Sequence, residues 1–132
     1  MIELIWDRGR SGTATAPTGA SITVGEASDF SPDDLIAAAA AGCLMRTFLA
    51  RASAAGVPVL SYASASHVET SGGVKTPQVM IRCYVVTTDS TSAPGVDELL
   101  LESLRESGVC QLLGDAVTCQ ADIRRLCGVC AK

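Results

Sequence analysis

SPDDLIAAAAAGCLMRTFL, residues 31–49, is the stretch that decides the fold of this chain. Ser31 is a preferred helix N-cap, Pro32 suits the first helical position, and Asp34 is placed to complete a capping box. The alanine run continues the helix, and Gly56 supplies a C-terminal stop. The sequence therefore predicts one long helix of about 24 residues, or roughly 36 Å.

Small side chains in the middle of this helix allow it to pack closely against another backbone. Residues 37–42 are all Ala or Gly, and bulk returns only at Leu44, Met45, Phe48 and Leu49. We expect the helix to be the central element and its middle to be buried on nearly every side.

The composition describes a compact and unusually apolar protein. The chain has 132 residues, 48% hydrophobic and only 18% charged, which excludes intrinsic disorder and predicts a single domain over residues 1–132. Such a chain exposes apolar surface, and self-association is the simplest way to cover it. The net charge is −4 and the ten Lys and Arg residues are scattered, so neither nucleic acid nor an anionic membrane is an expected partner.

The N-terminus and the cysteine content bear on the cellular compartment. The opening residues MIELIWD carry acids where a secretion signal has basic residues, and the longest apolar run, residues 35–45, is about half of the ~20 residues of a membrane helix. We therefore expect a cytoplasmic protein without a membrane span. Its six cysteines are then expected to be reduced thiols used for chemistry, metal binding or packing.

Strand and helix patterns alternate along the rest of the chain. Short β-prone pieces separated by Gly and Pro predict an antiparallel meander over residues 2–24. Two strands are expected at residues 61–69 and 78–88, then a second helix at 94–107 and, after a short turn, a final strand at 116–126. This mixture predicts an α+β fold.

Four of the cysteines have simple structural explanations. Cys83 and Cys119 alternate in phase with branched apolar residues of their strands, where a buried cysteine packs as a small hydrophobe. Cys127 and Cys130 form a CxxC, a spacing that can hold zinc or cycle as a dithiol. A structural zinc site needs four ligands and the chain has one histidine, so a frayed tail is the simpler interpretation and no metal site is predicted.

Cys43 and Cys110 are the candidates for thiol chemistry. Cys43 lies in the most apolar stretch of the long helix, beside Gly42, and core packing is the alternative explanation for it. Cys110 lies on the short turn after the second helix, where a thiol can move. A fixed thiol facing a mobile one is what a resolving pair needs, because one becomes a sulfenic acid and the other condenses with it to a disulfide.

Residues 31–45 resemble the signature of the OsmC/Ohr hydroperoxide reductases. In that family an S/N-P-E-E-L stretch opens a long Ala-rich helix, and the reactive cysteine follows the glutamate by ten residues. Asp33 and Cys43 reproduce this spacing, with Asp in place of Glu. Cys110, 67 residues after Cys43, lies where the family carries its second cysteine. Residues 7–13 are similar to the family's Arg-x-Gly turn, in which Arg8 or Arg10 would be the family arginine.

The resemblance implies both a fold and an activity. The fold is a two-layer OsmC-like α+β fold, with antiparallel sheets packed around a long central helix in an intertwined homodimer. The activity is that of a thiol-dependent peroxidase of the oxidative stress response, an antioxidant enzyme with no bound cofactor. The Cys43 thiolate would attack an organic hydroperoxide, Cys110 would resolve the sulfenic acid, and an external dithiol or lipoyl-type reductant would restore the enzyme.

Physical arguments limit how such a site can be built. Burial raises a thiol pKa above its free value of about 8.5, so the Cys43 thiolate needs a cation, and the resemblance assigns Arg8 or Arg10, held by Asp33. The dipole of its own helix does not help, because Cys43 lies about three turns past the start. Asp33 and Cys43 are roughly 15 Å apart along one helix, so if they cooperate they come from two chains.

The side chains around Cys43 suggest a preference among substrates. An apolar pocket lined by residues such as Leu44, Met45 and Phe48 would favour organic hydroperoxides over hydrogen peroxide. Two alternatives stay open. One is a non-catalytic protein of the same fold that binds an apolar small molecule, with Cys43 merely packed. The other is a metal-binding protein that uses Cys119 and the C-terminal CxxC.

Overall fold

The structure is a computed structural model that describes residues 1–26, 30–70, 77–88 and 95–126. It divides into two compact units, residues 1–36 and 37–132. The single domain over residues 1–132 stays a prediction.

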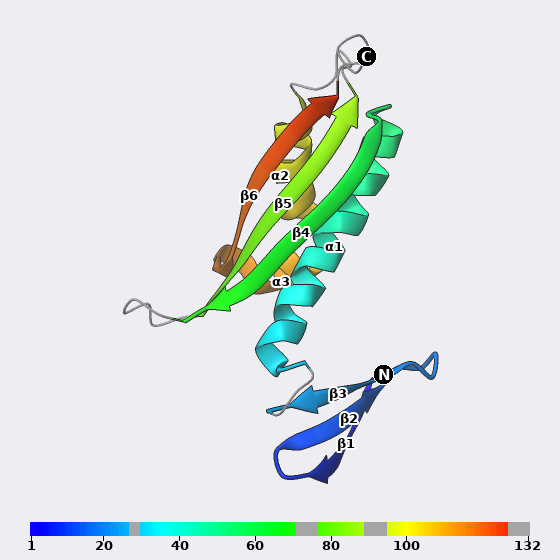
Figure 1. Ribbon diagram of the computed structural model, residues 1–132, viewed down its shortest axis with the longest axis vertical. Coiled ribbons are helices and arrows are strands. Elements are labelled where there is room, and N and C mark those ends of the chain that lie inside the picture. The colour runs from blue at the N-terminus through cyan, green and yellow to red at the C-terminus, as the bar shows by residue number, and fades with distance from the viewer. Residues whose placement is uncertain (27–29, 71–76, 89–94, 127–132) are drawn as a thin grey trace. The chain divides into compact units, whose positions relative to one another are not determined.

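The N-terminal unit contains a three-stranded antiparallel meander, as predicted (Figure 1). Its strands are β1 (Glu3–Arg8), β2 (Ser11–Thr15) and β3 (Ser21–Gly25). Gly9 turns the chain between β1 and β2 with φ 56°, a conformation that favours glycine, and the Trp6 indole N–H donates to the Gly9 carbonyl at 2.9 Å. Most side chains of this sheet are exposed, including Trp6 at 73%, so the sheet does not bury a core of its own.

Helix α1 (Pro32–Ala54) has the signals that the sequence predicted at both ends. The Asp34 N–H donates to Ser31 Oγ and the Ser31 N–H donates to Asp34 Oδ2, each at 3.1 Å, which is the reciprocal bonding of a capping box. Gly56 has φ 72°, and the backbone hydrogen bonds around it are those of a Schellman motif. Local sequence therefore accounts for the bounds of the longest helix.

The C-terminal unit contains a mixed sheet. Its strand order is β4 (Val59–Glu69), β5 (Gln78–Thr88) and β6 (Val117–Leu126). β4 and β5 are antiparallel, whereas β5 and β6 are parallel. The prediction of antiparallel sheets is therefore wrong for β6. The physical reason is the helical crossover between β5 and β6, which brings the chain back to the end of the sheet at which β5 began.

The described part of the crossover contains helix α2 (Val96–Glu106), helix α3 (Gly108–Leu113) and the short 3-10 helix η2 (Gly114–Ala116). The turn expected around Cys110 is thus a short helix. All three helices, α1 to α3, lie against one face of the mixed sheet, so sheet and helices form two layers (Figure 1). Arg51 on α1 pairs with two carboxylates of α2, those of Glu102 at 3.0 Å and of Glu106.

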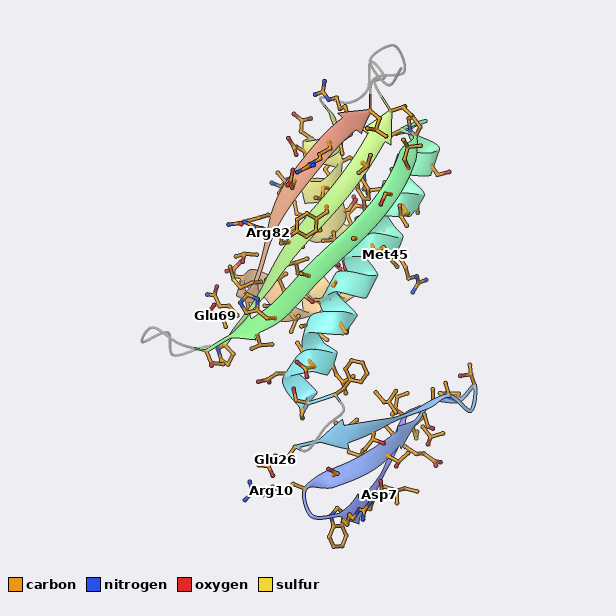
Figure 2. The ribbon with its side chains drawn as sticks, in the orientation of Figure 1. Asp7, Arg10, Glu26, Met45, Glu69 and Arg82 are labelled. Carbon is orange, nitrogen blue, oxygen red and sulfur yellow. The ribbon has the colours of Figure 1, made fainter. Side chains whose placement is uncertain are left out.

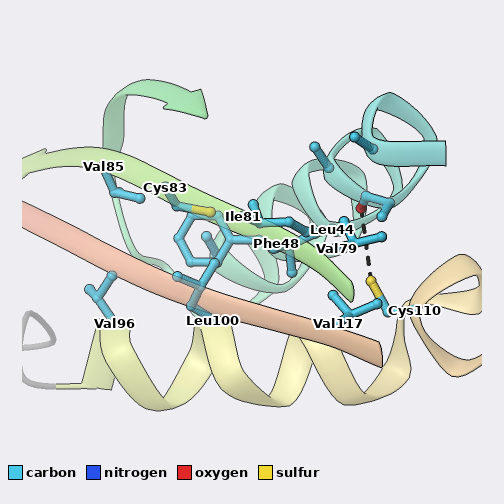
Figure 3. Close-up of a cluster of buried hydrophobic side chains, with 14 of the residues drawn as sticks. Leu44, Phe48, Val79, Ile81, Cys83, Val85, Val96, Leu100, Cys110 and Val117 are labelled. Atoms are coloured by element: carbon cyan, nitrogen blue, oxygen red, sulfur yellow. Dashed lines mark hydrogen bonds between the residues drawn. The ribbon is translucent and has the colours of Figure 1, made fainter. Parts of the chain in front are cut away.

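The core of this unit lies between the sheet and the helices. The predicted inward face of β5 is buried, with every member at most 4% exposed: Val79, Ile81, Cys83 and Val85. Leu44 and Phe48 of α1 enter the same core with no exposed surface (Figure 3). The Phe48 ring lies 5.7 Å from that of Tyr62 on β4.

α1 has one buried face and one exposed face. Its buried residues are Ala37, Ala40, Ala41, Leu44, Phe48 and Ala52. Ala38, Met45 and Leu49 are exposed, so the expectation that the middle of the helix is buried on nearly every side is wrong within one chain. By length and composition alone α1 could cross a membrane, but the core helix of a globular unit has the same properties, and the buried face of α1 fits that interpretation.

Candidate functional site

Cys43 lies partly exposed on α1 and faces the beginning of α3. Three groups there stabilise its thiolate: the Ser107 hydroxyl, the Val109 N–H and the Gly108 N–H. The Ser107 hydroxyl, which can donate to the thiolate, is the largest cause that lowers the pKa of Cys43; the Val109 N–H is next, and burial opposes both. Arg46, on the same helix, adds a favourable charge.

Ser107 owes its position to the break between α2 and α3. Its extended backbone, with φ −62° and ψ 124°, ends one helix and leaves the first amides of the next without helical partners. Its side chain has no exposed surface, and Oγ has no hydrogen-bond partner among the described residues. A buried hydroxyl without a partner is unfavourable, so this one is free to donate to a thiolate that forms beside it.

Cys110 is the buried member of the pair. It lies on α3, 4% exposed, and its Sγ donates to the carbonyl of Ala40 on α1 at 3.8 Å (Figure 3). Burial raises the pKa of Cys110 and outweighs the Ser107 hydroxyl, which lowers it; a charge on Cys43 raises it further. Cys43 and Cys110 therefore share one neighbouring hydroxyl, and Cys43 is the thiol that ionises first.

The predicted charge partners lie in the N-terminal unit. Arg10 pairs with Glu26 at 3.0 Å, and both side chains are largely exposed (Figure 2). Arg8 ends β1 and Asp33 lies in the first turn of α1, and both are exposed. Their contact with Cys43 stays a prediction.

The predicted substrate pocket is not assembled by the described part of one chain. Leu44 and Phe48 are fully buried in the core, whereas Met45 is 38% exposed on another face of α1. The C-terminal Cys127 and Cys130 lie outside the described residues. Within those residues, no group of three or more His, Cys, Asp or Glu side chains is placed to hold a metal ion.

The sequence interpretation missed the donors to Cys43. It looked for a distant arginine and set aside the start of α1, whereas the donors come from the start of another helix. Ser107 and Gly108 carried a usable signal, because a Ser-Gly pair at the end of one helix and just before Cys110 predicts a break with free amides.

In the part of the chain that the structure describes, two three-stranded sheets, three α-helices and a cysteine pair around one buried hydroxyl define an α+β protein with a thiol site between two helices. Residues 25–122 match the family described as OsmC-like protein, and the chain belongs to that family. The match includes Asp33, Cys43 and Cys110 and begins after Arg8 and Arg10. Among curated proteins, none matches the chain.

Solved structures show the same fold. An OsmC-like protein of unknown function from Vibrio cholerae superposes with a TM-score of 0.81 at 16% identity, covering 92% of this chain and 97% of that one. An organic hydroperoxide resistance protein OsmC from Legionella pneumophila gives a TM-score of 0.66 at 13% identity, with 94% of this chain and 96% of that chain covered. The organic hydroperoxide resistance protein OhrB of Bacillus subtilis gives 0.65 at 13% identity, with 94% and 98% covered.

Proposed function

We propose that this chain is a thiol-dependent peroxidase that reduces organic hydroperoxides to alcohols. The observation that carries the proposal is that the pKa values of two neighbouring thiols are shifted in opposite directions. Three donors lower the pKa of Cys43, and burial raises the pKa of Cys110. An attacking thiol must be a thiolate, whereas a resolving thiol must wait as a thiol until the first is oxidised. Two proteins of similar fold are named for organic hydroperoxide resistance.

The proposed reaction has three steps. The Cys43 thiolate attacks the distal oxygen of the hydroperoxide, the O–O bond breaks, and the alkoxide takes a proton and leaves as the alcohol, with a sulfenic acid on Cys43. Cys110 then attacks that sulfur, a disulfide forms, and the hydroxyl leaves as water. An external dithiol of the lipoyl type reduces the disulfide by exchange and is itself oxidised. In this proposal the electrons come from that reductant and no bound cofactor takes part.

Ser107 holds the thiolate before the attack. Its hydroxyl and the amides of Gly108 and Val109 take the place of water around the sulfur of Cys43, so partial burial does not return the proton to it. Arg8 or Arg10, held by Asp33, would add a charge at the same sulfur. Since Asp33 lies ten residues before Cys43 on one helix, we propose that this charge comes from a second chain.

The second chain would also cover exposed apolar surface. Met45 and Leu49 are exposed on α1 at 38% and 37%, and Ile5 and Trp6 on β1 at 63% and 73%. A homodimer that buries such groups gains the free energy of removing them from water. Met45 is the exposed member of the predicted pocket, so an apolar pocket that holds the organic part of the substrate would form at this interface.

We also propose a cytoplasmic location, because reduced thiols are the working groups of the proposed reaction. Neither nucleic acid nor a membrane is proposed as a partner, since the charge is −4 and its basic residues are scattered.

Hydroperoxide consumption with excess dithiol tests the proposal. We expect cumene hydroperoxide to be consumed with dihydrolipoamide by the wild type, and by the matched variant that keeps Cys43 and Cys110 but has Cys119, Cys127 and Cys130 replaced by Ser. In that background Cys43→Ser should abolish turnover. Without dithiol, Cys110→Ser should complete one oxidation and leave a sulfenic acid that dimedone traps. Sustained turnover by Cys43→Ser in that background would end the peroxidase proposal and favour the binding-protein alternative.

A further inference from the structure

Two thiols outside the proposed active site touch across neighbouring strands. Cys83 Sγ on β5 and Cys119 Sγ on β6 lie 3.7 Å apart, within hydrogen-bonding distance for sulfur. The Tyr62 hydroxyl on β4 lies 3.3 Å from Cys83 Sγ, so three titratable groups form a diagonal row across the sheet. The parallel register pairs Cys119 with Ile81, two residues before Cys83, which places both sulfurs on the helix-covered face.

The two thiols differ in access and in proton affinity. Cys83 has no exposed surface, whereas Cys119 is partly exposed, so a small molecule reaches Cys119 first. The hydrogen bond from Cys119 lowers the pKa of Cys83 to about 7, with help from Tyr62 and against burial. The pKa of Cys119 is raised, chiefly because its proton bonds to Cys83. The pair therefore loses one proton near neutral pH and shares the other between two sulfurs in contact.

We propose that Cys83 and Cys119 form a second redox site, a dithiol that a small hydroperoxide converts to an interstrand disulfide. The site uses neither Cys43 nor Cys110, so it does not depend on the proposed function.

The chemistry balances with the hydroperoxide as the oxidant. When the shared proton moves to Cys83, the Cys119 thiolate attacks the distal peroxide oxygen, and the O–O bond breaks to give a sulfenic acid and an alkoxide. The alkoxide takes up the proton that the pair released and leaves as the alcohol. Cys83 then attacks Cys119 Sγ, and the hydroxyl leaves with the remaining thiol proton as water. Two thiols and one hydroperoxide give one disulfide, one alcohol and one water.

Closing the bond requires the edge strand to move. Diagonal neighbours in a sheet are about 8 Å apart at Cα, given about 4.8 Å between strands and about 3.3 Å per residue along them. A disulfide spans at most about 7 Å between Cα atoms. Among the described strands, β6 pairs only with β5 and lies at the edge of the β4-β5-β6 sheet, so it can shift along β5 without breaking the pairing to another strand. The resulting bond would be strained and hence readily reduced by a dithiol, as a reversible modification requires.

The crossover gives this modification a consequence. The two cysteines are 36 residues apart, and the chain between them contains α2 and α3, including Cys110. A disulfide would tie the two ends of that segment together and shift the strand that directly follows it. The second dithiol is therefore placed to restrain the segment that carries Cys110.

The test uses the full chain with Cys43, Cys110, Cys127 and Cys130 replaced by Ser, so the proposed peroxidase pair is absent. After exposure to tert-butyl hydroperoxide, remaining thiols are alkylated and the protein is digested with trypsin. Cys83 and Cys119 fall in different peptides, residues 83–105 and 106–124. We expect complete loss of both thiols and a cross-link between these two peptides that dithiothreitol reverses.

A matched variant with Cys83→Ser in addition keeps the accessible Cys119 and should form no intramolecular cross-link. Tyr62→Phe should leave the rate of cross-linking unchanged well below the pKa of Cys83 and raise it severalfold well above that pKa, because the Tyr62 hydroxyl stabilises the charge on Cys83 and not on the attacking Cys119. A merely structural role of the hydroxyl would not give this pH dependence. Two results overturn the proposal. One is that both thiols remain free after the exposure. The other is that Cys119 is oxidised to a sulfenic or sulfinic acid while Cys83 stays free.

Discussion

Replacing Ser107 by Ala tests the structural cause of Cys43 reactivity. The Ser107 hydroxyl is the largest cause that lowers the pKa of Cys43. A hydrogen bond to a charged group contributes about 1.5–3 kcal/mol, and the lower figure applies because Cys43 is partly exposed. Losing this hydrogen bond lowers the fraction of Cys43 present as thiolate at a pH below its pKa to about one tenth of the parent value, since about 1.4 kcal/mol is a factor of ten.

The nucleophilicity of the remaining thiolate offsets part of this loss. A more basic thiolate is a better nucleophile. With a Brønsted slope of about 0.5, each remaining thiolate reacts roughly threefold faster. We therefore expect Ser107→Ala to react about threefold more slowly than the parent at low pH and about threefold faster at a pH where both are fully ionised. The two pH profiles must cross, which a simple loss of folded protein cannot produce.

The assay is the rate of iodoacetamide alkylation of Cys43 as a function of pH. Trypsin releases residues 11–46 as a peptide with Cys43 as its sole cysteine, so that peptide reports this thiol alone. Ser103→Ala is the matched control, because Ser103 is equally buried but donates to the Leu99 carbonyl of its own helix at 2.7 Å. Ser107→Ala removes a hydroxyl that has no hydrogen-bond partner among the described residues, so the free energy of unfolding should be nearly unchanged. A Ser107→Ala profile that superimposes on that of the parent would refute the reasoning.

Three further predictions follow from packing, assembly and charge. Phe48→Ala should lower the free energy of unfolding by about 3–5 kcal/mol in urea denaturation, because the ring is fully buried; a loss below about 1 kcal/mol would contradict its place in the core. Met45→Glu should dissociate the proposed homodimer in sedimentation, because it puts a charge into the covered face, and a wild type that is monomeric at micromolar concentration would exclude that dimer. Only one of Arg8→Met and Arg10→Met should raise the pKa of Cys43 in the alkylation assay, since an exposed charge beyond about 8 Å is screened, and no change with either would exclude the arginine assignment.

Much of the fold could be predicted from the sequence because it depends on interactions between residues close together in the chain. The reciprocal bonds of Ser31 and Asp34 and the left-handed Gly56 involve residues a few positions apart, so the ends of α1 could be predicted from neighbours in the chain. Alternation along residues 78–88 is also local, and it identified the buried face of β5 correctly. The spacing of Cys43 and Cys110 singled out two thiols that the structure places near one hydroxyl.

Contacts between distant segments were decided only by the tertiary structure. Strand periodicity is the same for either direction, so the parallel pairing of β6 followed from the crossover that returns the chain. Ser107 reaches Cys43 from 64 residues away, and the contact of Cys83 with Cys119 depends on the register of two strands. A sequence pattern reports which face of an element is apolar. Which other helix or strand packs against that face depends on the arrangement of all the elements around the core. A pattern within one element does not contain that information.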